Sequence, residues 1–146
     1  ADDLVVEGYA AVFNSTTDLG SFQERIAPGA FADVLDDDVR LLINHDGVPL
    51  ARTSNGTLKL KEDEDGLYYR GVLSDTQAGR DLYTMSQRGD ISQSSFAFTI
   101  GEESVDEDGV RVIEKVSRLI DVSPVTYPAY QAASVYARAE EKKEND

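Results

Sequence analysis

The chain has 146 residues, a formal net charge of -14 at pH 7, one histidine and no cysteine. This length fits one domain with a hydrophobic core, and the lack of cysteine excludes a disulfide scaffold and thiolate metal sites. The negative charge argues against nucleic acid or anionic membranes as partners and favours basic peptides. No apolar run is long enough to span a bilayer, and Ala1–Asp3 lacks the features of a signal peptide, so we expect a cytoplasmic setting.

Most of the predicted elements are strands. β-branched and apolar residues recur in short runs, and two of the turns between them have the sequence Asp-x-Asp-Gly. Several short strands separated by turns are typical of a barrel or a sandwich. The predicted strands are Leu4–Val12, Val39–Asn44, Leu58–Glu62, Leu67–Leu73, Phe96–Val105 and Val110–Ile120.

Two helices interrupt the strands. The pattern predicts a short helix over Pro28–Leu35 and a longer one over Asp75–Arg88, which is followed by Gly89 in the position of a C-terminal cap. The apolar residues that share a face are Phe31, Val34 and Leu35 in the first helix, and Ala78, Leu82 and Met85 in the second.

The two acidic turns, Asp63–Gly66 and Asp106–Gly109, could be taken as calcium loops. A calcium-binding EF-hand needs flanking helices, whereas strand patterns flank both turns. Asp and Gly also suit tight hairpin turns on their own. We therefore expect hairpin turns and neither a metal ion nor a cofactor.

The single histidine, His45, is the best candidate for a general base, although a lone histidine is more often structural. The segment after residue 90 supplies serines as nucleophiles, among them Ser94 and Ser95. In an extended strand Ser94 shares a face with Phe96 and Phe98, which suit the core, while Ser95 points the other way. This alternation favours Ser95 as the nucleophile; the competing interpretation is a solvated polar face.

A catalytic histidine also needs an acid that holds its tautomer. Asp46 is adjacent to His45, but neighbours in a strand point to opposite faces. Asp121 lies in an otherwise apolar strand, where an acid is seldom buried without a partner. His45 would be such a partner, and an arginine such as Arg118 is the alternative.

Beyond these single residues, the chain as a whole resembles a known family. The resemblance extends from about Gly8 to Ala137, and it rests on five short motifs in a fixed order. Together they resemble the prohead proteases of tailed bacteriophages. The motifs are Gly8–Phe13, Glu24–Phe31, Asn44–Asp46, Ser95–Phe98 and Asp121–Ala129.

The resemblance implies a serine endopeptidase of capsid maturation, related in fold to the herpesvirus assemblins. The expected fold is α+β and mainly β, a herpesvirus-protease-like β-barrel with a few surrounding helices. Such enzymes act in the host cytoplasm inside the assembling procapsid, on the major capsid protein, its scaffolding segment and themselves, and assemblins suggest a homo-oligomer. We expect a protease domain over 1–137 and a charged, flexible tail over 138–146, with further residues before Ala1 and a segment after the tail lost by self-cleavage.

By motif position, the resemblance places the family's histidine on His45, its nucleophile on Ser95 and its acid on Asp121, where relatives often carry Glu. Glycine is common in the family where this chain has Ala97. His45 would take the proton of Ser95, Asp121 would orient the imidazole, and backbone amides of the loop Tyr127–Gln131 would stabilise the oxyanion.

Two other functions compete with this interpretation. The first is a non-catalytic β-barrel module that binds capsid or scaffold. The second is a serine esterase for small molecules, which the absence of a Gly-x-Ser-x-Gly elbow disfavours.

Overall fold

The computed structural model describes residues 3–128 and 134–137. Strands dominate these residues, and α1 (Gln77–Arg88) is the one α-helix among them, accompanied by the 3-10 turn η1 (Thr53–Asn55). The α+β, mainly β class is therefore confirmed. The strands are β1 (Leu4–Val12), β2 (Thr17–Asp18), β3 (Gln23–Ile26), β4 (Arg40–Ile43), β5 (Asp46–Arg52), β6 (Leu58–Glu62), β7 (Gly66–Leu73), β8 (Gln93–Val105), β9 (Arg111–Val125) and β10 (Ser134–Ala137).

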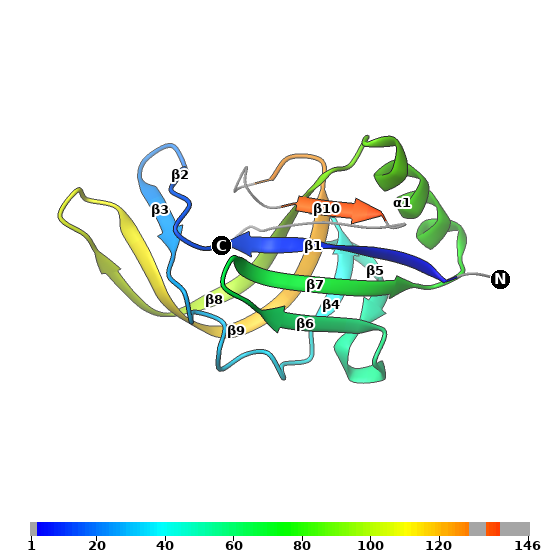
Figure 1. Ribbon diagram of the computed structural model, residues 1–146, viewed down its shortest axis with the longest axis horizontal. Coiled ribbons are helices and arrows are strands. Elements are labelled where there is room, and N and C mark those ends of the chain that lie inside the picture. The colour runs from blue at the N-terminus through cyan, green and yellow to red at the C-terminus, as the bar shows by residue number, and fades with distance from the viewer. Residues whose placement is uncertain (1–2, 129–133, 138–146) are drawn as a thin grey trace.

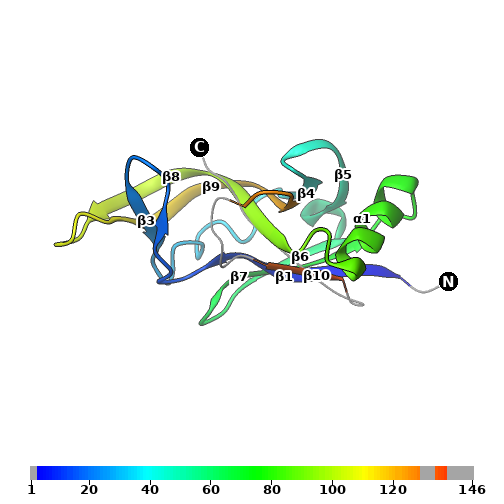
Figure 2. The ribbon, with the colours of Figure 1, turned by 90° about the horizontal axis from the view of Figure 1, so that it is seen from above.

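The strands form two sheets that pack as two layers (Figures 1 and 2). One sheet has the order β10-β1-β7-β6, and the other has the order β2-β3-β9-β4-β5 with β8 paired to β9. All pairs are antiparallel except those of β9 with β3 and with β4. Between residues 3 and 128 and in β10 the pairs do not close into a ring, so the expected herpesvirus-protease-like barrel is not confirmed.

The core lies between the sheets and is built on aromatic rings. Phe96 of β8 is fully buried, with its ring centroid 5.3 Å from that of Phe31 and 4.6 Å from that of Phe98. On the same side of β8, the hydroxyl groups of Ser94 and Tyr69 are 2.6 Å apart. The prediction that the phenylalanine face of this strand faces the core is confirmed.

Both acidic turns are hairpin turns, as predicted. The carboxylate of Asp63 accepts the backbone N–H groups of Asp65 and Gly66 at 2.8 and 3.0 Å. In the second turn the carboxylate of Asp106 accepts the backbone N–H groups of Asp108 and Val110, at 2.9 and 3.0 Å. A cluster of three or more potential metal ligands is not found within the described ranges.

The predicted helix over Asp75–Arg88 is confirmed as α1. The hydroxyl of Thr76 caps its first turn by accepting the N–H of Gly79 at 3.2 Å, and Gly89 caps its end at a φ of 86°. On its predicted inner face Leu82 is fully buried, and the neighbouring apolar side chains pack against the core.

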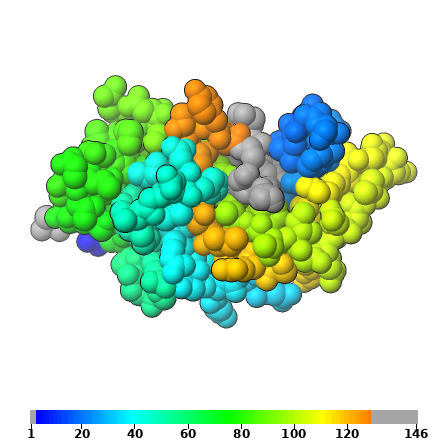
Figure 3. Space-filling view, turned by 180° about the vertical axis from the view of Figure 1, so that it is seen from behind, coloured from blue at the N-terminus to red at the C-terminus, as the bar shows by residue number. Residues whose placement is uncertain are grey.

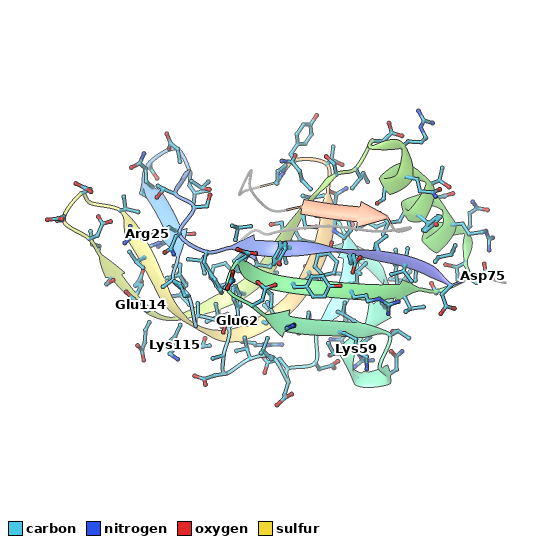
Figure 4. The ribbon with its side chains drawn as sticks, in the orientation of Figure 1. Arg25, Lys59, Glu62, Asp75, Glu114 and Lys115 are labelled. Atoms are coloured by element: carbon cyan, nitrogen blue, oxygen red, sulfur yellow. The ribbon has the colours of Figure 1, made fainter. Side chains whose placement is uncertain are left out.

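The predicted helix over Pro28–Leu35 is wrong. These residues form consecutive turns whose N–H groups bond to carbonyls three residues earlier, and Gly29 has a φ of 88° that an α-helix does not accept. The pattern still identified the inward residues, because Phe31 and Val34 are buried. Glu62 at the end of β6 holds this segment by accepting the N–H of Phe31 at 3.1 Å (Figure 4).

The predicted tail over 138–146 lies outside the described residues. Of the described part of the chain, no helix has both the length and the apolar character that a membrane crossing requires.

Beyond the core, β8 and β9 extend as a long hairpin that β3 holds in place (Figure 1). Glu24 of β3 is fully buried and accepts hydrogen bonds from two nitrogens of Arg111, at 2.7 and 2.6 Å. Its neighbour Arg25, labelled in Figure 4, forms an ion pair with Asp106 at the tip of the hairpin. The Arg25 guanidinium and the turn's backbone N–H groups hold the pKa of the Asp106 carboxyl below its usual range.

We expect Asp106→Asn to lower the stability of the protein at neutral pH but not in strong acid. Asparagine keeps the oxygen that accepts the backbone N–H groups and loses the charge that pairs with Arg25. Because the folded pKa is depressed, the stabilisation is present above the unfolded pKa and disappears as the pH falls through the folded one. Urea unfolding at a series of pH values measures the gap between variant and wild type.

Asp108→Asn is the matched control, since it removes the same charge from the same turn. A gap that does not close on acidification, or an equal gap in the control, would contradict the role of the Arg25–Asp106 pair.

Candidate active site

His45 lies in a two-residue turn that joins β4 to β5. Ile43 at the end of β4 pairs with Asp46 at the start of β5, and the residues between them, Asn44 and His45, have φ angles of 55° and 58°. Two positive φ angles in succession are typical of the type I′ hairpin turn, where asparagine is favoured. The sequence pattern predicts a continuous strand here, whereas the structure has a turn, and the imidazole of His45 lies against Asp121.

This turn is fastened to the end of β9. The N–H of Asn44 donates to the carbonyl of Pro124 at 3.0 Å, and its side-chain oxygen accepts the N–H of Thr126 at 2.9 Å. The N–H of His45 donates to the hydroxyl of Ser123 at 3.3 Å. In Figure 3 the cyan segment of β4 and β5 lies against the orange end of β9. The backbone position of the histidine is thus set by a strand almost 80 residues further along the chain.

The imidazole of His45 is hydrogen-bonded to Asp121. Its Nδ1 lies 2.7 Å from Oδ1 of that carboxylate, which is 4% exposed. A carboxylate can only accept, so Nδ1 carries a proton and the neutral ring presents its lone pair at Nε2. No ion pair joins Asp121 to Arg118, the alternative partner, within the described ranges. The structure therefore brings together two of the three candidate residues.

Ser95 lies on the neighbouring strand, on the same face of the sheet. In the β8–β9 register Ser95 is opposite Ser123 and Ala97 is opposite Asp121. Side chains of directly opposed residues share a face, with Cβ atoms about 4.5–5.5 Å apart. Ser95 therefore lies next to the hydroxyl that contacts both His45 and Asp121, whereas Ser94 faces the core, as predicted.

Two polar atoms of this cluster are buried without a hydrogen-bond partner in the described part of the chain. They are Oγ of Ser95 and Nε2 of His45, the atoms between which a serine protease transfers its proton. An unpaired buried polar group costs about 1–3 kcal/mol, and such groups concentrate at functional sites. The two atoms do not form a hydrogen bond with each other here, and catalytic bonds of this kind commonly tighten only with substrate bound.

The predicted oxyanion loop, Tyr127–Gln131, falls largely on residues 129–133, outside the described residues. Of its described part, Tyr127 is 89% exposed. Sequence reasoning missed Asn44 and Ser123. The Asn that precedes His45 was a turn signal, and the two-residue spacing of Ser123 from Asp121 places both on one face of a strand.

Comparison with known proteins gives a match to proteases. The chain matches the family model of the caudovirus prohead serine proteases over residues 1–146, and it belongs to this family. It is 32% identical over 141 residues to the prohead protease of Enterobacteria phage HK97, in an alignment that covers 91% of this chain and 59% of that relative. The chain thus spans less than two thirds of the relative's length. No solved structure gives a significant match, so the fold relation to herpesvirus assemblins stays a prediction.

The turn before the histidine can be tested with two substitutions. We expect Asn44→Ala to lower the free energy of unfolding more than Asn44→Gly does, by about 1 kcal/mol, because only glycine accepts a positive φ without strain. Both variants lose the side-chain bonds to Thr126, so their difference isolates the backbone. Urea unfolding measures it, and an alanine variant as stable as the glycine variant would contradict the left-handed turn.

Proposed function

We propose that the protein is a serine endopeptidase of capsid maturation in which Ser95 is the nucleophile, His45 the general base and Asp121 the orienting acid. One observation carries the assignment: the only histidine is bound at Nδ1 by a buried carboxylate, and its other nitrogen is buried without a partner in the described residues. Ser95 lies on the same face of the sheet and is equally unpaired. Membership of a serine protease family supports this chemistry.

In the proposed mechanism His45 acts first as a base and then as an acid, while Ser95 forms and later breaks a bond to the substrate. Nε2 of His45 takes the hydroxyl proton as Oγ of Ser95 attacks the scissile carbonyl carbon. The protonated imidazole then gives that proton to the leaving amine as the C–N bond breaks, which leaves an acyl-enzyme for water to hydrolyse by the same route. The Asp121 carboxylate holds Nδ1–H throughout and stabilises the imidazolium, an effect that its burial strengthens.

We propose the substrates and the setting on the basis of the family. The relative's name places its action in the prohead, and we carry this over to capsid proteins inside the procapsid, assembling in the host cytoplasm. The scaffolding segment of the major capsid protein and the protease itself are the proposed targets, and we propose that the enzyme forms a homo-oligomer. The net charge of -14 favours basic stretches in such segments.

We also propose that the two sheets form a herpesvirus-protease-like β-barrel. One seam between the two sheets is bridged by a hydrogen bond from the N–H of Ser74, which follows β7, to the carbonyl of Leu50 in β5, at 3.0 Å. A bridge between sheets of this kind is what barrel closure requires on that side.

The competing function is a non-catalytic module that binds capsid or scaffold. Such a module would have no use for an unpaired imidazole nitrogen beside a serine, and its function would survive removal of the Ser95 hydroxyl.

We expect Ser95→Ala to reduce proteolysis by roughly three or more orders of magnitude while the fold is retained. Co-expression of the full-length protein with the major capsid protein of its phage, followed by mass spectrometry of the fragments, measures capsid-protein cleavage and self-cleavage. Ser92→Ala is the control, since Ser92 is exposed and three residues earlier in the chain. Undiminished cleavage by the Ser95 variant would contradict the assignment of Ser95 as the nucleophile. If cleavage were lost only in Ser94→Ala, the nucleophile would be Ser94.

We expect Asp121→Asn to slow cleavage strongly, because an amide can hold the imidazole in the wrong tautomer and cannot stabilise its charged form. Asp121→Glu should retain more activity, since it keeps the charge, and the motif resemblance implies Glu at this position in relatives. Time courses of self-cleavage compare the three proteins. Wild-type rates in the asparagine variant would show that the unit is a dyad or uses another acid.

A further inference from the structure

Ser123 is a buried polar residue of the site that the proposed mechanism does not use. It lies on β9, two residues after Asp121, and is fully buried. Its hydroxyl donates to Oδ1 of Asp121 at 2.8 Å and accepts the backbone N–H of His45 at 3.3 Å. A serine hydroxyl has a single proton to donate, so this proton is committed to the carboxylate.

These contacts form a closed ring of three hydrogen bonds. The His45 side chain bonds to Oδ1 of Asp121, and the same oxygen accepts a hydrogen bond from the Ser123 hydroxyl. That hydroxyl in turn accepts the backbone N–H of His45. The first bond alone would leave the carboxylate free to turn, and the contacts of Asn44 fasten the turn one residue before His45. The other two bonds restrict rotation of the carboxylate and hold the backbone of His45 itself, whose φ of 58° is unfavourable without support.

The position of Ser123 opposite Ser95 adds to this argument. The β8–β9 register places the two residues side by side on one face, so the group that holds the histidine also neighbours the nucleophile. Its proton points to Asp121 and not to the imidazole, which distinguishes it from a second nucleophile.

We propose that Ser123 is a positioning residue, an inference that rests on the proposed function: it fixes the Asp121 carboxylate and the His45 backbone so that Nε2 is held at the nucleophile in the correct tautomer. Ser123→Ala removes a single oxygen atom from the strand. The carboxylate then loses one donor and the His45 N–H loses its acceptor, while both catalytic side chains stay in the chain.

The test uses two readouts on the full chain. The first is the second-order rate at which an alkyl fluorophosphonate modifies Ser95, which needs no knowledge of the natural substrate. The second is the ¹⁵N spectrum of the single imidazole, which reports the share of the Nδ1-protonated tautomer. Ser117→Ala is the matched control, since Ser117 is an exposed serine of the same strand whose hydroxyl bonds to that of Thr99 at 2.7 Å.

We expect Ser123→Ala to lower the modification rate about ten- to a hundredfold, as misplacement by about 1 Å does in other active sites, and to reduce the Nδ1-protonated share. Ser117→Ala should match wild type in both readouts. An unchanged tautomer share in Ser123→Ala would overturn the inference whether or not the protein is a protease, and so would equal losses in the two variants. Failure of wild type to react at Ser95 would instead count against the proposed function, and the imidazole spectrum would still decide the role of Ser123.

Discussion

The buried carboxylate of Asp121 is the constraint on which the rest of the site depends. A charge with 4% exposure is costly in the interior unless hydrogen bonds surround it, and here Oδ1 is bonded by both the His45 ring and the Ser123 hydroxyl. The imidazole must therefore lie over β9, and the β4–β5 turn must reach that strand. The contacts of Asn44 with the end of β9 hold the turn there.

β9 brings the three candidate residues together from distant parts of the chain. It carries Asp121, pairs in parallel with the strand that precedes His45, and pairs antiparallel with the strand of Ser95. A slip of one residue between β8 and β9 would turn Ser95 to the core. The stacked rings of Phe96 and Phe98 oppose such a slip, because they can be buried on one face only.

Much of this arrangement could be predicted from the sequence where a strong local pattern exists. Leu4–Val12 and Leu58–Glu62 are strands with the predicted bounds, and alternation alone separated Ser95 from Ser94. The family was also correctly identified from five short motifs. The catalytic roles of His45, Ser95 and Asp121 stay predictions.

The failures have physical reasons. β5 was not predicted because its first half is exposed and contains Gly47 and Pro49, poor strand formers that only the pairing with β4 keeps extended. Between the pairs Ile43–Asp46 and Leu41–Ala51, β5 advances by five residues and β4 by two, a bulge that no periodicity indicates. At Pro28–Leu35 the apolar spacing fits a helix, but turns with hydrogen bonds between residues three apart bury Phe31 and Val34 instead.

The proposed mechanism requires the three groups to act on one substrate carbonyl, and a crystal structure of the protein inhibited by a peptidyl phosphonate tests this directly. The measured quantity is the distance from Nε2 of His45 to Oγ of the modified serine. We predict phosphorus bonded to Ser95, Nε2 within about 3 Å of that oxygen, and the bond from Nδ1 to Asp121 retained. Phosphorus on another residue, or an imidazole turned away from Ser95, would contradict this mechanism.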